Sequence, residues 1–225
     1  MEKQGEHDLD YMGGVFDRIS KNLEKEVIVY HIGGNAMCWH GLKDTTKDAD
    51  LVLTSESEAN SLKHALSNSG FLEVEVVSLP GYEHMNQYAV FDEIAETPLN
   101  QEFAPGLRIE LFLNQICGGF KFSDAMKSRS IHAKDRGLLK EYYCSAEDIF
   151  LFKSITGRER DLIDMQIIAK PGLEWDTLAD EFSGQIGSRP AVRGFLETFN
   201  DSASILGKEY RTEVPVSVLR KINNL

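Results

Sequence analysis

The sequence predicts an α/β or α+β fold, with strands and interspersed helices in its first half and helices alone in its second half. Residues 27–32 (VIVYHI) form a continuous β-branched run, which is typical of a buried strand. Residues 107–113 (LRIELFL) alternate apolar and polar side chains, the pattern of a strand with one buried face. From Ser145 onward the apolar residues recur at helical spacing. We therefore expect two domains, residues 1–144 and residues 145–225.

Capping residues, glycines and prolines indicate where the other elements begin and end. Ser55 and Glu58 form a capping box, and Gly70 is a helix stop. Ser145 begins a second capped helix, and the prolines and glycines of residues 80–106 indicate loops. The further strands expected are at 48–53, 71–79 and near 88–91. The further helices expected run from Ser55 to about Ser69, from Ser145 to Ala169 and from Glu174 onward, and over 9–23, where Gly13 and Gly14 weaken the prediction.

Composition and charge exclude several classes of protein. The hydrophobic fraction is 42% and the charged fraction 27%, which excludes a disordered or collagen-like chain. No apolar run approaches the roughly 18–20 residues that cross a bilayer, and the first eight residues are acidic, unlike a secretory signal. Three widely spaced cysteines fit reduced thiols. We expect a cytoplasmic location, no membrane partner and, at a net charge of −12, no broad basic footprint for nucleic acid.

Two aspartates in the second predicted strand are the most informative residues. Asp48 and Asp50 are two positions apart, so in a strand both carboxylates point to the same face, about 6.6 Å apart at the Cα atoms. Ala49, Leu51 and Leu53 form the opposite, apolar face. A divalent cation would relieve the repulsion between the two acids, and Mg²⁺ typically takes one or two carboxylates plus substrate phosphates. The alternative is a solvated sheet face on which both aspartates are merely exposed.

A glutamate and a pair of glycines add to this pattern. Glu110 is a lone acid between Ile109 and Leu111, and it can join the same cluster if its strand is adjacent, since neighbouring strands lie about 4.8 Å apart. Three carboxylates on adjacent strands suit a pair of metal ions. Gly33 and Gly34 directly follow a strand, where they let backbone N–H groups approach a phosphate. A simple tight turn is the alternative for the glycines.

Together these motifs resemble those of the nucleotidyltransferase superfamily, the DNA polymerase β-like fold. Ile32-Gly33-Gly34 is followed after thirteen residues by Asp48-Ala49-Asp50, and the third acid of the family matches Ile109-Glu110-Leu111. The resemblance implies an α+β fold whose mixed sheet is flanked by helices, with the catalytic domain in residues 1–144. It further implies a set of roles: Asp48, Asp50 and Glu110 as catalytic ligands of Mg²⁺ or Mn²⁺, and Gly33, Gly34 and Asn35 as binding residues for a nucleoside triphosphate such as ATP.

A second stretch resembles one branch of this superfamily. Residues 145–153 and 157–165 look like the helical motif of stand-alone prokaryotic nucleotidyltransferases, which include the toxins of type IV toxin–antitoxin systems. Physically, Lys153 can neutralise a triphosphate as a point charge, and Arg158 or Arg160 can clamp it. Asp161 and Asp164 are one helical turn apart and can orient Lys153 or the arginines. The resemblance implies a partner antitoxin or toxin protein. The alternative is an ordinary salt-bridge face on a helix.

The function predicted is Mg²⁺-dependent transfer of a nucleoside monophosphate from a nucleoside triphosphate to an acceptor hydroxyl, with release of pyrophosphate. The acceptor stays open: an RNA 3′ end such as that of tRNA, a protein side chain or a small molecule. Residues 121–141 carry a net charge of +3 and can receive an RNA acceptor or more triphosphate, with a solvated surface as the alternative. The alternative function is a nucleotide- or partner-binding module, an antitoxin or a regulatory subunit, without turnover. The site requires Glu110 to lie on the same sheet face as Asp48 and Asp50.

Overall fold

The protein is described here by a computed structural model, in which residues 5–75, 87–94, 106–188 and 194–224 are described. They divide into two compact units. The first unit contains residues 5–75, 87–94, 106–114 and 130–144, and the second contains residues 115–129, 145–188 and 194–224. The contacts divide the chain after Cys144, and they group residues 115–129, which lie within the expected range 1–144, with the second unit, so the domain boundaries stay a prediction.

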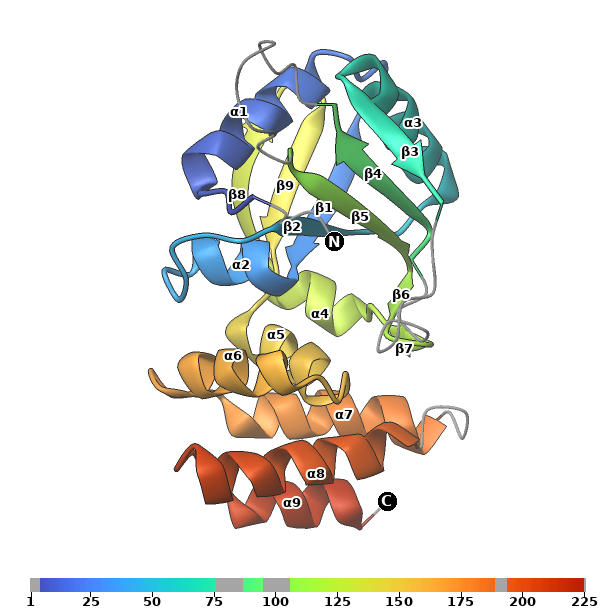
Figure 1. The fold of residues 1–225 in the computed structure, drawn as a ribbon. Coiled ribbons are helices and arrows are strands. Elements are labelled where there is room, and N and C mark those ends of the chain that lie inside the picture. The colour runs from blue at the N-terminus through green and yellow to red at the C-terminus, as the bar shows by residue number, and fades with distance from the viewer. Residues whose placement is uncertain (1–4, 76–86, 95–105, 189–193, 225) are drawn as a thin grey trace. The chain divides into compact units, whose positions relative to one another are not determined.

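Among the described residues the first unit contains a seven-stranded sheet with the order β3-β4-β5-β2-β1-β9-β8 (Figure 1). The pairs β1–β9 and β2–β5 are parallel, and the other neighbours are antiparallel. The predicted α+β class, a mixed sheet flanked by helices, is confirmed. The strands are β1 (Val27–Ile32), β2 (Asp48–Leu53), β3 (Phe71–Val74), β4 (Ala89–Glu93), β5 (Arg108–Leu113), β8 (Ile131–Arg136) and β9 (Leu139–Tyr143).

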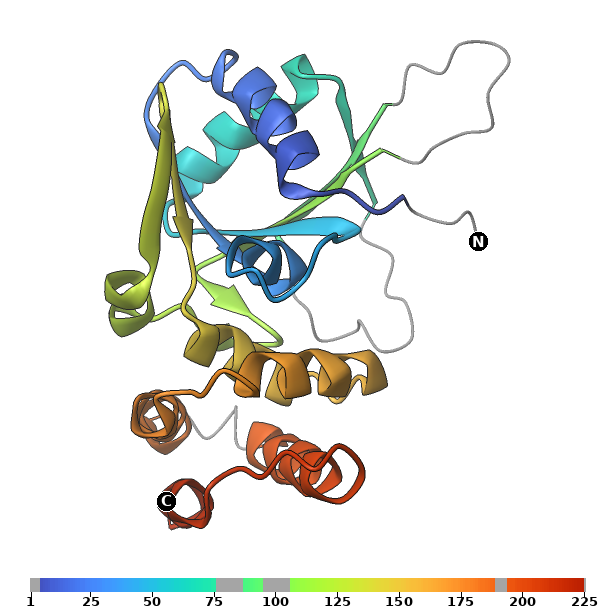
Figure 2. The ribbon, with the colours of Figure 1, turned by 90° about the vertical axis from the view of Figure 1, so that its left-hand side faces the viewer.

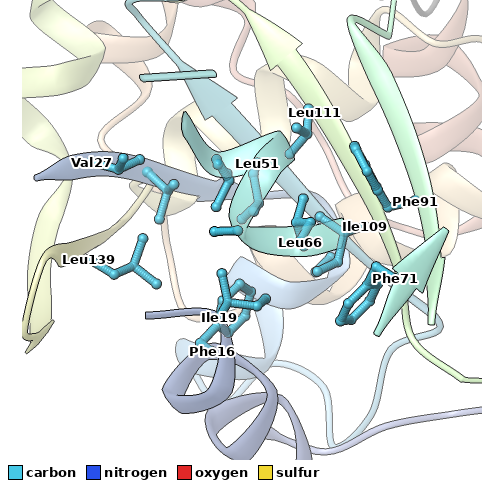
Figure 3. Packing of buried hydrophobic residues seen from close by; sticks show 14 of the residues in the cluster. Phe16, Ile19, Val27, Leu51, Leu66, Phe71, Phe91, Ile109, Leu111 and Leu139 are labelled. Atoms are coloured by element: carbon cyan, nitrogen blue, oxygen red, sulfur yellow. The ribbon is translucent and has the colours of Figure 1, made fainter. Parts of the chain in front are cut away.

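Two helices of the first unit cover one face of this sheet, α1 (Leu9–Ser20) and α3 (Glu56–Asn68) (Figure 2). The Ser55 side chain accepts a hydrogen bond from the Glu58 backbone N–H, as the capping box predicts. Apolar side chains of α1, α3 and the inner sheet face form one continuous core (Figure 3). A shorter helix, α2 (Gly33–Trp39), follows β1 directly.

The predicted elements of the first half are found, some with different bounds. Strands β1 and β2 have the predicted ranges, and the predicted strand at 88–91 is β4. Of the predicted strand at 71–79, residues 71–74 form β3, while residues 76–79 and most of the predicted loops lie outside the described residues. No element was predicted between 115 and 143. Strand β8 lies there at the sheet edge, and because its residues are almost all exposed it shows no apolar alternation.

Helices make up most of the second unit, as expected. Ser145 caps the helix that it was predicted to begin, since its side chain accepts from the Asp148 backbone N–H. No helix in the described part of the chain is long and apolar enough to cross a membrane. The elements are β6 (Gln115–Ile116), β7 (Phe120–Lys121), α4 (Asp124–Arg129), α5 (Ala146–Ser154), α6 (Glu159–Ala169), α7 (Trp175–Ser188), α8 (Gly194–Glu209) and α9 (Val216–Asn223).

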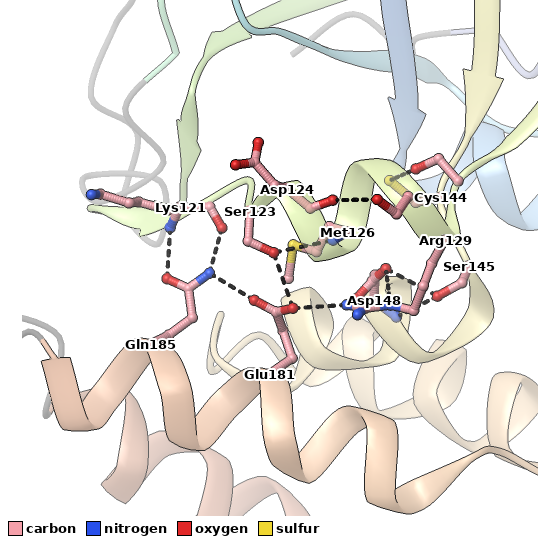
Figure 4. Close-up of polar contacts among 12 residues, drawn as sticks. Lys121, Ser123, Asp124, Met126, Arg129, Cys144, Ser145, Asp148, Glu181 and Gln185 are labelled. Atoms are coloured by element: carbon pink, nitrogen blue, oxygen red, sulfur yellow. Dashed lines mark hydrogen bonds and ion pairs between the residues drawn. The ribbon is translucent and has the colours of Figure 1, made fainter.

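A polar network connects α4, α5 and α7 within the second unit (Figure 4). The Arg129 guanidinium donates to Asp148 Oδ1 at 2.6 Å and to Glu181 Oε2 at 2.9 Å. Gln185 donates to the Lys121 carbonyl at 2.6 Å and accepts from the Lys121 N–H at 3.1 Å. Burial raises the pKa of Asp148 despite the opposing effect of Arg129. These charges are satisfied by one another, which indicates a structural role.

Candidate functional site: the acidic face of the first unit

The predicted acids lie on strands β2 and β5. Both strands place these side chains on the sheet face opposite the apolar core. Leu51 and Ile109 belong to the core cluster, so the residues that alternate with them point to the other face. That face carries Asp48 and Asp50 from β2 and Arg108 and Glu110 from β5, and we call these four residues the acidic face. Glu110 therefore lies on the same side of the sheet as both aspartates, as the predicted site requires.

The register brings the acids of the two strands close together. Strands β2 and β5 are parallel neighbours, with Asp50 opposite Glu110 and Asp48 opposite Arg108. Residues in register on adjacent strands are about 4.8 Å apart at their Cα atoms. Glu110 is 8% exposed, whereas Asp48 and Asp50 are half-buried. The acidic face thus combines one buried carboxylate with two that solvent reaches.

The glycine turn between β1 and α2 lies directly against this face. Gly33 has a φ of +61°, and a Cβ built on it would lie 2.1 Å from Asp50 Oδ2. A Cβ built on Gly34 would lie 2.3 Å from the Thr46 hydroxyl oxygen. Both distances are shorter than real Cβ contacts, so a side chain at either position would force the Asp50 or Thr46 side chain to shift. The backbone of the turn therefore approaches the Asp50 carboxylate without any side chain between them.

Two polar residues next to Glu110 were missed by the sequence analysis. Arg108 donates to both carboxylate oxygens of Asp92 on β4, at 2.7 and 2.9 Å. The hydrogen bond to Asp92 raises the pKa of Arg108, and the charges of Asp48 and Glu110 add to this effect. Gln87 donates from Nε2 to Glu110 Oε2 at 3.0 Å. Arg108 stands two residues before Glu110, so the period of the strand could have placed it on this face.

The residues of the acidic face suit Mg²⁺ or Mn²⁺ in the kind of donor they offer. Carboxylate oxygens are hard ligands of the type that these ions take. Among the described residues, however, no three His, Cys, Asp or Glu side chains are arranged as a metal-binding group. Mg²⁺ typically uses one or two carboxylates together with water and substrate phosphates. The face fits an ion that binds together with a polyphosphate better than a cage made of protein ligands alone.

Asn35 follows the glycine turn, but its side chain is directed into the core. The residue is fully buried, and its Nδ2 lies 2.6 Å from Nδ1 of His31. Its Oδ1 is buried and has no hydrogen-bond partner among the described residues. Only the backbone of Asn35 belongs to the turn, so a nucleotide contact through its side chain stays a prediction.

The other predicted binding residues belong to the second unit and form a buried ion cluster there. Lys153 Nζ lies 2.9 Å from Asp161 Oδ1 and 2.6 Å from Asp164 Oδ2. Arg158 Nε lies 2.7 Å from Asp161 Oδ2. The Lys153 and Asp161 side chains are 8% and 3% exposed. Asp161 and Asp164 pair with these cations, so a direct contact of Lys153 with a triphosphate, which stays a prediction, would require the ion pairs to open.

The pKa of Asp161 reflects this environment. Burial raises the pKa of Asp161. The charges of Lys153 and Arg158 and a hydrogen bond from the Thr156 hydroxyl lower it by a larger amount, so the net pKa is below the ordinary value. Thr156 donates to Asp161 Oδ2 at 2.5 Å. The Asp161 carboxylate is therefore charged and fully engaged within its own unit.

The basic segment 121–141 offers less free positive charge than its sequence suggests. Four of its cations pair with carboxylates among the described residues: Lys127 with Asp124, Arg129 with Asp148 and Glu181, Arg136 with Asp17 and Glu141, and Lys140 with Asp135. Paired cations neutralise fewer phosphates than free ones. The segment therefore gives little support to a long RNA acceptor.

Comparison with known proteins adds little to this geometry. No protein-family model matches the chain, and no curated protein matches it. One solved structure, a protein from H. pylori provisionally described as a nucleotidyltransferase, is similar over 97% of this chain and 98% of that chain. The TM-score is 0.44 and the sequence identity 16%, values at which the similarity carries no conclusion about this chain's activity.

Proposed function

We propose that the acidic face binds a nucleoside triphosphate together with Mg²⁺ and transfers its nucleoside monophosphate to an acceptor hydroxyl, releasing pyrophosphate. The observation that carries the proposal is the register of Asp50 opposite Glu110 on one sheet face, with a glycine turn against Asp50. The three acids supply carboxylate oxygens on one sheet face, the donor type that Mg²⁺ takes together with substrate phosphates. The glycine turn brings main chain without side chains next to the Asp50 carboxylate, where phosphate oxygens bound to the same ion would come.

Each residue of the site would have its own role, set by its position. Asp48, Asp50 and Glu110 would hold the ion, which when bound stabilises charge on the attacking and leaving oxygens. Glu110, buried next to Gln87, would accept the proton of the acceptor hydroxyl. The backbone N–H groups of Gly33 and Gly34 would donate to the phosphates.

Arg108 is the cation on this face and would bind phosphate oxygen alongside the acids. Its contact with Asp92 fixes the guanidinium in one orientation, and Asp48 and Glu110 lie close enough to influence its pKa. An oriented guanidinium binds phosphate through two parallel hydrogen bonds. Lys153 and Arg158 receive no contact with the triphosphate in this proposal, since they belong to the ion cluster of the second unit and their side chains are only 8% and 18% exposed.

A small-molecule or protein acceptor agrees better with the charge than a long RNA does. The net charge of −12 repels a polyanion, and most cations of segment 121–141 are paired. A short RNA end such as that of tRNA stays within the proposal, as does a partner antitoxin acting as protein substrate or inhibitor.

The test is a transfer assay with the α-phosphate of each nucleoside triphosphate labelled, in the presence of Mg²⁺ or Mn²⁺. Acceptors are total RNA, a protein extract, the protein itself and small hydroxyl compounds. We expect label transfer with pyrophosphate release by the wild type and a loss of about 10³-fold in Asp48→Asn and Asp50→Asn, as expected when a group that stabilises transition-state charge is removed. Asp135→Asn, an exposed aspartate on β8, is the control and should keep full activity. Transfer that persists undiminished in both variants would remove the acidic face from the reaction.

A second candidate function is nucleotide binding without turnover. It is favoured by the lack, among described residues, of three His, Cys, Asp or Glu side chains already arranged around an ion. A thermal-shift titration separates the candidates, because a ligand that binds only the folded state raises the melting temperature with its concentration. A shift with Mg²⁺ and a nucleotide but no transfer to any acceptor would favour the binding module.

A further inference from the structure

A buried polar network lies on the core side of the sheet, behind the glycine turn. His31 on β1 and Glu141 on β9 are 0% and 1% exposed. His31 Nε2 lies 3.2 Å from Glu141 Oε1, and Nδ1 lies 2.6 Å from the Asn35 Nδ2. The neutral tautomer with its proton on Nε2 satisfies both contacts, because the ring then donates to Glu141 and accepts from the Asn35 amide.

Aromatic contacts hold the His31 ring in this orientation. The ring stacks on Tyr143 at a centroid distance of 4.3 Å and meets the Phe16 ring edge-on at 5.0 Å. Tyr143 also stacks on Trp39, the last residue of α2, at 5.0 Å. Helix α2 is therefore held at both ends. Asn35 near its start contacts β1, and Trp39 at its end contacts β9.

Glu141 in turn is held by Arg136. The Arg136 guanidinium forms an ion pair with Glu141 and a 3.0 Å hydrogen bond to the Gly13 carbonyl of α1. Burial raises the pKa of Glu141, but the hydrogen bond from His31 and the charge of Arg136 hold it below the ordinary value. The carboxylate therefore stays charged and keeps accepting from His31.

Burying this network of polar and charged side chains costs desolvation free energy. Apolar residues of similar volume often replace a buried ion pair without loss of stability, so its presence in the middle of a sheet is weak support for a role in stability alone. Of its members, Asn35 is the one that belongs to α2 and the glycine turn. The network thus connects the rigid core to the backbone that lies on Asp50.

Helix α2 needs this support because its own structure is weak at the start. It has seven residues, and its N-cap residue, Ile32, makes no side-chain capping hydrogen bond. Helices of this length are unstable unless other contacts hold them. The Asn35–His31 contact satisfies no backbone N–H, but it ties the first turn of α2 to β1, two residues from Gly33, the residue that packs on Asp50.

We propose that His31 and Glu141 are positioning residues that fix α2 and the glycine turn over Asp50 by way of the Asn35 side chain. This inference rests on the proposed function, since it assigns the two residues to the same site. They touch no reacting group. Their effect is on the position of the backbone that would bind phosphate, and a misplacement of about 1 Å at such a site can lower a rate by roughly 10²-fold.

The first measurement needs no activity. Hydrogen–deuterium exchange is followed at the amides of Met37, Cys38 and Trp39, which donate to the carbonyls of residues 33–35 when α2 is formed. We expect His31→Leu to exchange at least about tenfold faster at these amides. We expect His31→Gln, which keeps one donor and one acceptor, to exchange nearly as slowly as the wild type.

A matched control separates positioning from general loss of stability. Glu93 accepts from the Tyr11 hydroxyl at 2.6 Å and from the Leu107 N–H at 3.0 Å and pairs with Arg18, so these partners lie on α1 and directly before β5 rather than on α2. Glu93→Gln should lower the melting temperature and leave α2 exchange unchanged. If His31→Leu does not fold, Glu141→Gln replaces it, with a smaller acceleration expected because His31 keeps an uncharged acceptor.

The second measurement is the kcat and KM of nucleotidyl transfer, at a temperature where every variant is folded. We expect His31→Leu to lower kcat by about 10²-fold with KM within about threefold, and His31→Gln to restore most of kcat. Exchange and kcat in His31→Leu that equal those of Glu93→Gln would overturn the positioning role while leaving the proposed function intact. Faster α2 exchange in His31→Leu without any transfer by the wild type would overturn the proposed function and leave the positioning role standing.

Discussion

The two units of the protein both carry buried or half-buried charges, but they use them differently. In the second unit the acids are matched by cations: Asp161 with Lys153 and Arg158, and Asp148 with Arg129, at 2.6 to 2.9 Å. In the first unit Asp50 lies against the glycine turn, opposite Glu110 on the next strand. The ion pairs of the second unit account for its buried acids, and the acidic face of the first unit is where our proposal places the ligand.

The difference shows that a motif made of charged residues has to be judged by what surrounds it. Lys153 and Asp50 were both predicted as site residues, yet Lys153 is 8% exposed and paired twice, while Asp50 is half-buried beside the turn. Buried ion pairs that lose one partner destabilise a protein strongly. Charges at a ligand site affect activity more than stability. Variants in the two units should therefore separate into these two classes.

The largest effect is expected from a matched pair of buried glutamates, one in each unit. Glu110→Gln should lower nucleotidyl transfer by about 10³-fold, or about 4 kcal/mol, with little change in the free energy of unfolding. Glu181→Gln should leave transfer unchanged and lower the free energy of unfolding by about 1–3 kcal/mol, since Glu181 accepts from Arg129, Ser123 and Gln185. Transfer assays and urea unfolding check both variants. Loss of transfer in Glu181→Gln together with loss of stability alone in Glu110→Gln would contradict the comparison.

The ion cluster of the second unit gives the largest expected change in stability. Lys153→Met removes the cation between Asp161 and Asp164 and should lower the free energy of unfolding by about 3–5 kcal/mol. Lys221→Met removes an exposed pair with Asp180 in the same unit and should cost less than about 1 kcal/mol. Denaturant titration measures both. A Lys153→Met protein of unchanged stability that had lost nucleotide binding would place Lys153 in the ligand site after all.

Alanine substitutions at two glycines of the first unit, both with positive φ, separate the effect of steric overlap from that of backbone strain. Gly33→Ala adds a Cβ 2.1 Å from Asp50 Oδ2, whereas Gly41→Ala adds one with nothing within 4 Å. The φ values are +61° and +68°, so backbone strain of about 1 kcal/mol is common to both. Gly33→Ala should cost about 1–2 kcal/mol more and also weaken nucleotide binding. Equal stability and equal binding in the two variants would show that the turn does not press on Asp50.

The pH dependence of stability gives the smallest effect. Burial raises the pKa of Asp161, but Lys153 and Arg158 lower it more, so the pKa in the folded state is below the ordinary value of about 3.9. The stabilisation by Asp161 is therefore present above about pH 4 and is lost as the pH falls through the folded pKa. Urea unfolding of wild type and Asp161→Asn from pH 3 to 7 should show a difference that disappears at the acid end.

Asp148→Asn is the control for the sign of this effect. Burial raises the pKa of Asp148, so its contribution is fully present below the unfolded pKa and is lost as the pH rises through the folded pKa. The stability of the wild type relative to Asp148→Asn should therefore increase toward low pH, the opposite of the trend for Asp161→Asn. The same slope for both variants would contradict the assignment of the two environments.

Sequence patterns predicted the elements that have strong local signals. The β-branched run of β1, the alternation in β2 and β5 and the capping serines of α3 and α5 each depend on neighbouring residues alone. Strand β8 was missed because it is an exposed edge strand with no apolar alternation. The grouping of residues 115–129 with the second unit was missed because it depends on contacts such as Arg129 with Glu181, across 52 positions.

The same limit applies to the site. The spacing of Asp48 and Asp50 fixes their shared face, but the register that sets Asp50 opposite Glu110 comes from the packing of the whole sheet. Asn35 follows the glycine pair and was therefore predicted as a binding residue, although its side chain is held in the core by His31. Glu141 lies 110 positions from His31, so no local pattern could have connected them.

The most direct test of the account is calorimetric titration of a nucleoside triphosphate with Mg²⁺ into wild type, Asp50→Asn and Asp161→Asn, with all three proteins folded. We expect tight binding by the wild type, a Kd about tenfold higher or more in Asp50→Asn, and a Kd within about twofold of wild type in Asp161→Asn. Unchanged binding in Asp50→Asn together with lost binding in Asp161→Asn would place the ligand in the second unit and contradict the account.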